Sequence, residues 1–247
     1  MSIILNDISV KYENSPEYIL RDVNIEINEG EFVCIVGQSG CGKSTLLKLV
    51  AGLQKPCHGN IVCNGKIVKT PGSDRVVMFQ EHGLYPWLNV FDNVEFGMKM
   101  NNVPKEEREE KAMYYLSMVG LDDYKEYYIH QLSGGMRQRV ALARALAMES
   151  DILLMDEPFS ALDKQTSNRL REELQNICLR TGKTVLFVTH SVEEAVYLAD
   201  RVIVLSSSTG EIDSEIEIEL PRPRTVYSSE FVDLRHKILD LVKGEIA

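Results

Sequence analysis

The sequence has no long hydrophobic segment. Its uninterrupted apolar stretches are short, as in Phe32–Val36, Ile152–Met155 and Val202–Leu205, whereas a membrane-spanning helix needs about 20 apolar residues. The opening segment MSIILNDISV has no basic residue, and Asp7 interrupts its apolar run, so we expect no secretory signal peptide. These absences predict a cytosolic chain without membrane spans of its own.

Positive charge is also scarce. The chain has 27 Lys and Arg residues against 37 Asp and Glu residues, which gives a formal net charge of -10. Affinity for nucleic acid comes mainly from neutralising phosphates, so an acidic chain is a poor general binder of DNA or RNA, and we expect no nucleic-acid partner. Any phosphate ligand must instead be bound by a local arrangement of residues.

Cysteine is sparse and lacks metal-binding spacing. Cys57 and Cys63 have only His58 as a neighbouring candidate ligand, which does not make a metal site. An odd number of cysteines in a cytosolic chain predicts reduced thiols. These residues are Cys34, Cys41, Cys57, Cys63 and Cys178.

The remaining sequence alternates strand and helix patterns without an internal repeat. Short apolar runs up to about residue 36 predict an antiparallel β region that leads into the buried strand Phe32–Val36. Turns are expected at residues 28–30, 59–60 and 64–65, and a helix from about Lys43 to Ala51. Between about residues 81 and 130, segments rich in Met, Tyr and charge predict a helical insertion with a helix over Pro104–Val119.

Three apolar strands follow the insertion, in DILLMDE, TVLFVTH and RVIVLS. Amphipathic helices separate them, and the spacing of Leu170, Leu174, Ile177 and Cys178 indicates a helix with one buried face. Ser191 and Glu194 have the spacing of a capping box at the start of another helix. Apolar strands alternating with such helices predict an α/β fold with a parallel sheet covered on both faces.

The segment GQSGCGKS, Gly37–Ser44, lies between a predicted buried strand and a predicted helix. This context supports a phosphate-binding loop, or P-loop, in which glycines let successive N–H groups approach an anion at the helix N-terminus. Lys43 would contact the β- and γ-phosphates, and the Ser44 hydroxyl would bind Mg²⁺. The predicted nucleotide contacts are Gly37, Gln38, Ser39, Gly40, Cys41, Gly42, Lys43, Ser44 and Thr45.

An apolar strand ending in carboxylates, Ile152–Glu157, supplies the second chemical feature. Behind a P-loop, Asp156 is expected to bind Mg²⁺, and Glu157 to polarise an attacking water. His190 ends another predicted strand, at the edge where parallel strands meet a ligand. We therefore predict that His190 contacts the γ-phosphate.

A second glycine-rich helix start lies in LSGGMRQR, Leu132–Arg139. Gly134 and Gly135 at a helix N-terminus form another anion site by the same physics. One nucleotide has a single γ-phosphate, so two such sites on one chain make sense if the second serves a nucleotide bound to another subunit.

With these motifs in this order, the sequence resembles the ATP-binding cassette (ABC) family, the ATPase subunits of ABC transporters. The resemblance runs from about Ile3 to Glu211 and implies a P-loop NTPase (RecA-like) core with an antiparallel β subdomain and a helical subdomain insertion. GQSGCGKST is similar to the Walker A loop, LSGGMRQR to the signature, and ILLMDEP to Walker B with its catalytic glutamate. The resemblance further implies a Q-loop glutamine at Gln80 that also contacts the metal, a D-loop ending at Asp163, a switch histidine at His190 and an adenine-stacking aromatic at Tyr12.

The family's working unit is a head-to-tail dimer that sandwiches two ATP molecules, so Ser133, Gly134 and Gly135 would act in trans. The resemblance implies an ABC ATPase domain over residues 3–220, with a helical insertion at about 81–135, and a short tail over 221–247. We expect no C-terminal regulatory barrel. Residues around Glu81–Met98, which include the only tryptophan, Trp87, are expected to contact an integral membrane permease.

Two segments are similar to cassettes of nitrate, sulfonate and taurine importers: Pro71–Val90 and the tail ELPRPRTVYSSEFVDLRHKILD. The resemblance therefore implies the ATPase of an importer for a small solute, held at the cytoplasmic face of the membrane by separate permease subunits. A solute-binding protein outside the membrane is expected in the full system.

Other functions remain open at this point. An efflux or lipoprotein-release cassette would differ mainly in its partner. A soluble cassette acting on ribosomes or DNA would usually have a second cassette or a long coiled-coil insertion. A small-molecule kinase would have no use for LSGGMRQR.

Overall fold

Two β-sheets form the centre of the computed structural model, which describes residues 3–11, 17–80, 83–206 and 208–244. The smaller sheet is antiparallel, with strand order β2-β1-β4-β5. The larger has order β10-β9-β3-β8-β7-β6 and is parallel except where β10 joins β9. Their bounds are β1 Ile3–Lys11, β2 Tyr18–Ile27, β3 Phe32–Val36, β4 His58–Cys63, β5 Lys66–Ile67, β6 Arg75–Met78, β7 Ile152–Asp156, β8 Thr184–Val188, β9 Arg201–Leu205 and β10 Ile212–Glu217.

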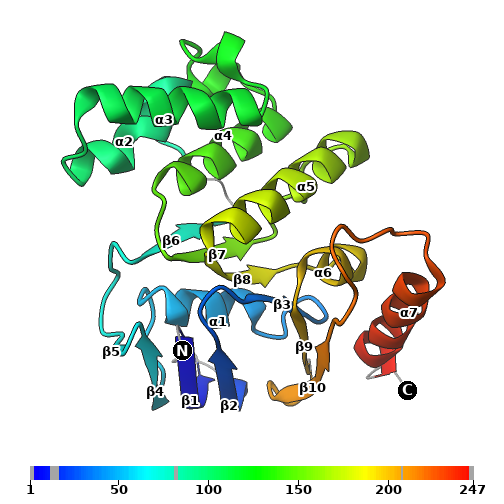
Figure 1. The fold of residues 1–247 in the computed structure, drawn as a ribbon. Coiled ribbons are helices and arrows are strands. Elements are labelled where there is room, and N and C mark those ends of the chain that lie inside the picture. Colours follow the sequence, from blue (N-terminus) through cyan, green and yellow to red (C-terminus); the bar gives the residue numbers. More distant parts are fainter. Residues whose placement is uncertain (1–2, 12–16, 81–82, 207, 245–247) are drawn as a thin grey trace.

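The central strands are apolar because both faces of the larger sheet are covered. Every residue of β3, β7 and β8 is buried. Along β3, Val33 and Ile35 join a core shared with helix α1 (Lys43–Val50) and the antiparallel sheet. The alternate residues, Phe32, Cys34 and Val36, face a second core lined by the other helices. Alternation along a strand thus divides the interior into two layers, which lie below and above the sheet in Figure 1.

The predicted helical insertion lies at the top of Figure 1. It contains α2 (Val90–Met100), α3 (Lys105–Met118) and two short 3₁₀ helices (Asp122–Tyr124 and Ile129–Gln131), and it packs on α4 (Gly134–Ala147). A partly buried ion pair between Arg108 Nε and Glu95 Oε2, 2.7 Å apart, joins α3 to α2.

Three further helices cover the upper face of the sheet and its right-hand end in Figure 1: α5 (Lys164–Thr181), α6 (Val192–Leu198) and α7 (Ser229–Lys243). The four residues predicted to form the buried face of α5 are all buried. α7 is anchored by Phe231 and Ile238, which are fully buried, and it packs against α6 and β9. Within the described ranges, no helix has the length and apolar character needed to cross a bilayer.

Two local predictions were wrong. Residues 59 and 60 lie inside β4, not in a turn, because β4 pairs with β1 and Asn60 faces Asn6. Gly59 is needed for close approach of the strands, since a Cβ there would lie 2.2 Å from the Asn6 carbonyl oxygen. The predicted capping box is only half formed: Ser191 Oγ accepts from Glu194 N, but the Glu194 carboxylate accepts from the Thr189 hydroxyl. All five cysteines are free thiols, as predicted.

Candidate active site

The loop over residues 37–42 connects β3 to α1 and needs glycine at two points. Gly42 precedes α1 with a φ of 101°, and a Cβ there would lie 2.8 Å from Leu20 Cδ2. A Cβ on Gly37 would lie 2.6 Å from the Leu205 carbonyl oxygen. Glycine therefore lets the loop wrap closely over the ends of the strands. No side chain caps the N-terminus of α1, and its first turn contains no acidic residue, so its N–H groups suit an anion.

Lys43 holds its charge inside this loop. The residue is only 7% exposed, and its Nζ donates to the carbonyl oxygens of Gly37 (2.8 Å) and Gln38 (2.7 Å). The Cys41 Sγ lies 3.6 Å from the same nitrogen. The ammonium group is thus fixed at the point where the loop and the start of α1 converge, the place required for a phosphate contact.

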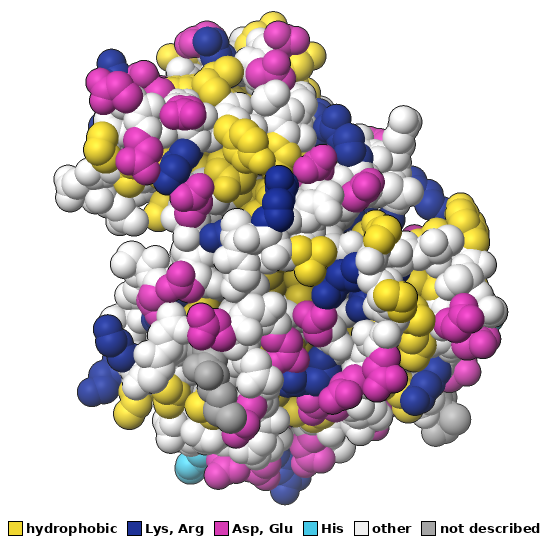
Figure 2. All heavy atoms as spheres, in the orientation of Figure 1, with side chains coloured by type: hydrophobic (Ala, Val, Ile, Leu, Met, Phe, Trp, Pro, Cys, Tyr) yellow, Lys and Arg dark blue, Asp and Glu magenta, His cyan; other side chains and the backbone are white. Residues whose placement is uncertain are grey.

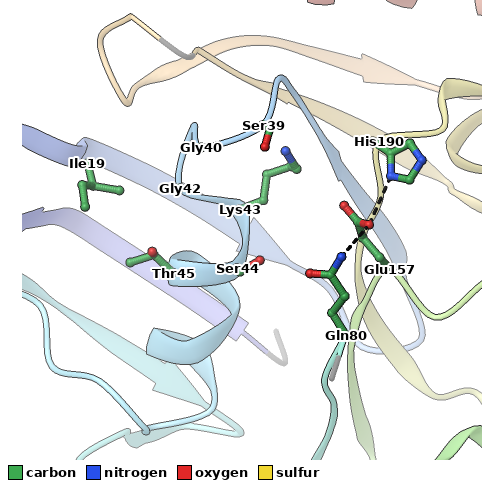
Figure 3. A pocket seen from close by; sticks show the side chains of 10 residues that line it. All are labelled: Ile19, Ser39, Gly40, Gly42, Lys43, Ser44, Thr45, Gln80, Glu157 and His190. Carbon is green, nitrogen blue, oxygen red and sulfur yellow. Dashed lines mark hydrogen bonds and ion pairs between the residues drawn. The ribbon is translucent and has the colours of Figure 1, made fainter. Parts of the chain in front are cut away.

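A cavity of about 560 Å³ opens over the P-loop (Figure 3). Its volume lies within the range of small-molecule sites, about 300–1,000 Å³. It brings together residues from β2, the P-loop, α1 and the ends of β6, β7 and β8. The lining residues are Ile19, Ser39, Gly40, Gly42, Lys43, Ser44, Thr45, Gln80, Glu157 and His190.

The wall opposite Lys43 is built around the Glu157 carboxylate. Gln80 Nε2 donates to Glu157 Oε2 (3.3 Å), and His190 Nδ1 lies 3.2 Å from the same oxygen; Figure 3 shows both contacts as dashed lines. Glu157 has a φ of 48°, in the left-handed region. Strain of this kind costs about 1–3 kcal/mol and concentrates at functional sites. Three residues predicted from separate motifs therefore meet at one carboxylate oxygen.

Asp156 ends β7 and is 5% exposed; it does not line the cavity itself but lies directly before Glu157, which does. Burial raises the pKa of its carboxyl group, a hydrogen bond with Ser44 lowers it, and the Glu157 carboxylate raises it further. Within the described chain, Asp156 Oδ1 is a buried oxygen without a hydrogen-bond partner. A buried, unsatisfied carboxylate oxygen beside a serine hydroxyl is the oxygen-rich environment that Mg²⁺ prefers.

The signature residues do not line this cavity. Ser133 is exposed and caps α4, where its Oγ accepts from Met136 N (3.2 Å). A Cβ on Gly134 would meet no atom within 4 Å. Asp163 likewise caps α5 by accepting from Thr166 N (3.0 Å), and hydrogen bonding there lowers the pKa of its carboxyl group. The structure therefore separates the predicted trans-acting residues from the P-loop of their own chain.

Two contributors were missed from sequence. Ile19 lines the cavity, but a β-branched residue in an early strand gives no functional signal. Gln138, in the signature helix, is 1% exposed; its Nε2 donates to the Glu157 carbonyl oxygen (3.0 Å), and its Oε1 accepts from Ala161 N (2.8 Å). The only clue in the sequence was position, because Gln138 lies one helical turn after Gly134 and therefore on the same face of α4. Tyr12, predicted to stack on adenine, lies outside the described residues.

The segment proposed for partner contact is partly described, since Glu81 and His82 lie outside the described residues. Trp87 is 69% exposed, and its ring lies 5.6 Å from that of Tyr85, which in turn contacts Phe96. Asn93 fixes this segment, because its buried amide bonds the backbone of Tyr85, Leu88 and Asn89. The aromatic side chain of Trp87 is thus presented to solvent by a well-held backbone.

Comparison with known proteins identifies the family of this sequence. The sequence model of the ABC transporter family matches residues 20–160. A nitrate import ATP-binding protein of Synechocystis sp. is 52% identical over 82% of this chain and 76% of its own length. A bicarbonate transport ATP-binding protein of Synechococcus elongatus is 41% identical over 99% of this chain and 91% of its own length. An aliphatic sulfonates import ATP-binding protein of Bacillus cereus is 38% identical over 97% of this chain and 95% of its own length.

Among solved structures, a dimeric post-hydrolysis state of an ATP-binding cassette, bound to ADP and Pi, superposes with a TM-score of 0.81. It is 33% identical and covers 89% of this chain and 100% of its own. These matches confirm the predicted fold, a P-loop NTPase core with a helical subdomain.

Proposed function

Because this chain belongs to the ABC transporter family of ATPases, we propose that it hydrolyses ATP in a sandwich dimer to drive uptake of a small solute through separate permease subunits. The observation that carries the proposal is the meeting of Gln80, Glu157 and His190 across one cavity from Lys43. Each element needed for phosphoryl transfer to water has a residue of suitable chemistry at this place.

Binding begins at the P-loop. Backbone N–H groups from Gly37 to Thr45 and the Lys43 ammonium would hold the β- and γ-phosphates, and Ile19 with Tyr12 would contact the base. Ser44, Gln80 and Asp156 would hold Mg²⁺, since Asp156 has an unpaired buried oxygen. When bound, this ion supplies positive charge to the phosphate oxygens.

The hydrolytic step is assigned to Glu157 as the group that accepts a proton from the attacking water. Gln80 and His190 position its carboxylate through their contacts with Oε2. His190 would then turn to the γ-phosphate, because its side chain is largely exposed at the cavity mouth.

The site is completed by a second copy of the chain. Ser133, Gly134 and Gly135 of one subunit, with Asp163 beside them, would close over the γ-phosphate held by the other. The γ-phosphate then favours the closed dimer, and its loss favours opening. The dimeric form of the ADP-bound relative supports this arrangement.

The coupled process is proposed to be import. The three import and transport relatives are named for nitrate, bicarbonate and sulfonates, so a small anion of this kind, or taurine, is the proposed solute. The permease would contact the segment from Glu81 to Met98, where Trp87 is exposed, and would hold the chain at the cytoplasmic face of the membrane. A solute-binding protein outside the membrane would deliver the solute.

Glu157→Gln tests the proposal. The amide keeps the shape of the side chain but cannot accept the proton, so hydrolysis should fall at least ~100-fold while ATP still binds. The bound ATP should trap a dimer that light scattering detects. Glu110→Gln, on the exposed face of α3, is the matched control and should hydrolyse ATP like the unmodified chain. A Glu157→Gln protein that hydrolyses ATP normally, or stays monomeric with saturating Mg-ATP, would contradict the proposal.

A further inference from the structure

A second large cavity, of about 640 Å³, lies outside the nucleotide site. α5, α6, the segment over residues 224–227 and the first half of α7 enclose it. Among the described residues that line it, five are cationic, namely Lys164, Arg169, Arg171, Arg224 and Arg235, whereas only Glu172 and Glu193 are acidic. In a chain with a net charge of -10, this cavity carries a local excess of positive charge. In Figure 2, Lys and Arg side chains border the hollow between α5 and α7.

Two of these guanidinium groups share a single carboxylate. Arg171 is 6% exposed, and its Nη1 lies 3.6 Å from Glu193 Oε1; Arg235 Nη1 lies 3.9 Å from the other oxygen, Oε2. Both distances exceed those of a charge-assisted hydrogen bond, about 2.7–2.9 Å. Within the described chain, the Nε atoms of both arginines are buried without a hydrogen-bond partner. Arg171 Nη2 also donates to Asn168 Oδ1, but this amide carries no charge, so the two guanidinium groups still exceed the single negative charge of Glu193.

The wall behind them is fixed by Arg224, which is also 6% exposed. Its guanidinium donates to the carbonyl oxygens of Val196, Ala199 and Ile218, among others. Burial, and to a smaller extent the neighbouring Arg222, lower the pKa of Arg224 to about 10, so the group stays charged at neutral pH. Arg224 thus holds the cavity wall rigid and adds to its positive potential.

Apart from the polar residues Asn168 and Thr225, the uncharged part of the lining is aromatic or aliphatic. Tyr197, Val226, Tyr227 and Val232 contribute side chains, and the Arg171 guanidinium lies 5.6 Å from the centre of the Tyr197 ring. Cationic donors beside an aromatic and aliphatic surface suit a ligand that has an anionic group and an apolar group. A simple inorganic ion would fill only a small part of this volume.

Helix α7 connects the cavity to the P-loop. Its first half carries Val232 and Arg235 into the cavity lining. Near its other end, the Val242 carbonyl oxygen accepts from Gln38 Nε2 in the P-loop (3.3 Å). A smaller cavity of about 300 Å³, lined among others by Glu157, His190, Arg171 and Glu193, lies between the two sites. Two structural routes therefore join the cationic cavity to the nucleotide site.

We propose that the cationic cavity is an effector site for a small organic anion with an apolar group, and that its occupancy alters nucleotide binding through α7 and Gln38. The anionic group would be held by Arg171 and Arg235, which Glu193 pairs incompletely, and the apolar group by Tyr197 and Val232. The binding half of this proposal does not depend on ATP hydrolysis.

Calorimetric titration of the full chain without nucleotide tests the site, with benzenesulfonate as the probe. We expect binding by the unmodified chain and at least tenfold weaker binding of the neutral benzenesulfonamide. Arg235→Glu should weaken benzenesulfonate binding at least tenfold and Arg235→Lys less, because lysine keeps the charge but not the fork of donors. Lys237→Glu makes the same charge change on an exposed turn of α7 and should leave the dissociation constant within twofold.

Three results would overturn the site. The first is no binding at about 10 mM benzenesulfonate, a concentration well above the ~1 mM dissociation constant of a weak ligand. The second is equal weakening of benzenesulfonate binding by Arg235→Glu and Lys237→Glu. The third is that benzenesulfonamide binds as tightly as benzenesulfonate. Melting temperatures of each variant separate a lost site from a lost fold.

The effector role is tested by titrating ATP with and without saturating benzenesulfonate. We expect the dissociation constant for ATP to change at least twofold, and ATP to change that for benzenesulfonate by the same factor, because coupling between two sites is reciprocal. Arg235→Glu should remove the effect. An ATP affinity that does not respond to bound benzenesulfonate would overturn this half of the proposal.

Discussion

The P-loop and the signature share one backbone arrangement but differ in how much of the surrounding site their own chain supplies. Each places glycines at the start of a helix, where N–H groups can hold an anion. At the P-loop, Lys43 is buried, Gly37 and Gly42 are in close contact with their surroundings, and Gln80, Glu157 and His190 lie across the cavity. At the signature, Ser133 is exposed and Gly134 has open space beside it. One region is therefore a nearly complete site, and the other has the properties of a surface that completes a site elsewhere.

The largest expected effects distinguish the P-loop from the signature, because only a P-loop mutation should weaken ATP binding to the monomer. Lys43→Ala and Ser133→Arg should each lower hydrolysis by about 10²–10³-fold, the effect of losing one group that stabilises the transition state. Only Lys43→Ala should weaken binding of ATP to the monomer, because Ser133 does not line the cavity of its own chain. Filter binding or calorimetry at low protein concentration measures this difference.

Mixing the two variants sharpens the same comparison. A mixed dimer has one intact P-loop facing one intact signature, so its hydrolysis should exceed that of either variant alone. Equal loss of monomer ATP binding in both variants, with no recovery on mixing, would place both motifs in one site.

The next effect concerns Gln138, which connects the two regions. Gln138→Leu should remove the hydrogen bond to the Ala161 N–H and one of the bonds to the Glu157 carbonyl oxygen, to which Ser160 also donates, at a cost of about 0.5–1.5 kcal/mol for each hydrogen bond lost. Urea unfolding should show this loss, and hydrolysis should fall because Glu157 is displaced. Gln165→Leu, at an exposed position of α5, is the control for stability; a similar loss there would remove Gln138 from its linking role.

Asp156→Asn should raise stability while abolishing hydrolysis. The pKa of this carboxyl is raised above its ordinary value of 3.8, with burial as the largest cause, so the charged form destabilises the fold once the pH exceeds that value. At pH 7 without nucleotide the variant should melt roughly 2–4 °C higher. The difference should shrink as the pH falls towards 3.8, because the raised pKa favours the protonated form of Asp156 in the folded chain. A variant less stable at pH 7 would contradict this assignment.

The smallest effect compares the two helix starts directly. Ser133→Ala removes the side-chain cap of α4 and should cost about 0.5–2 kcal/mol, whereas Ser133→Gly should cost only a few tenths. The start of α1 has no side-chain cap to remove, so Ser39→Ala, at an exposed position of the loop before this helix, should leave the stability of the nucleotide-free chain nearly unchanged. Chemical unfolding of the three variants checks this, and an equal loss at Ser39 would contradict it.

Much of the fold was predictable because local patterns agree with the tertiary structure. The buried strands Phe32–Val36 and Ile152–Asp156 and the buried face of α5 follow from runs and spacing of apolar residues alone. The turn predicted at residues 59 and 60 failed because glycine there serves a contact with β1, which local sequence does not reveal. The same limitation hid the bond between the Glu194 carboxylate and Thr189.

The sequence predicts which residues belong to the candidate active site but not how they are arranged. The motifs named Lys43, Asp156, Glu157 and His190, yet only the structure shows that Gln80 and His190 approach the same Glu157 oxygen. Gln138 and Ile19 were missed because their contributions come from contacts distant in sequence. The cationic cavity was hidden for the same reason, since its arginines come from α5, α7 and the segment between β10 and α7.

The exposed position of Trp87 has a practical consequence. It is the only tryptophan in the sequence, so the intrinsic fluorescence of the unmodified chain reports on one place, the segment that follows Gln80. A 69% exposed indole emits at long wavelength, and covering it with an apolar surface shifts the emission to shorter wavelength. Docking of the proposed permease and the rearrangement expected on nucleotide binding can therefore be tested in real time without an added label.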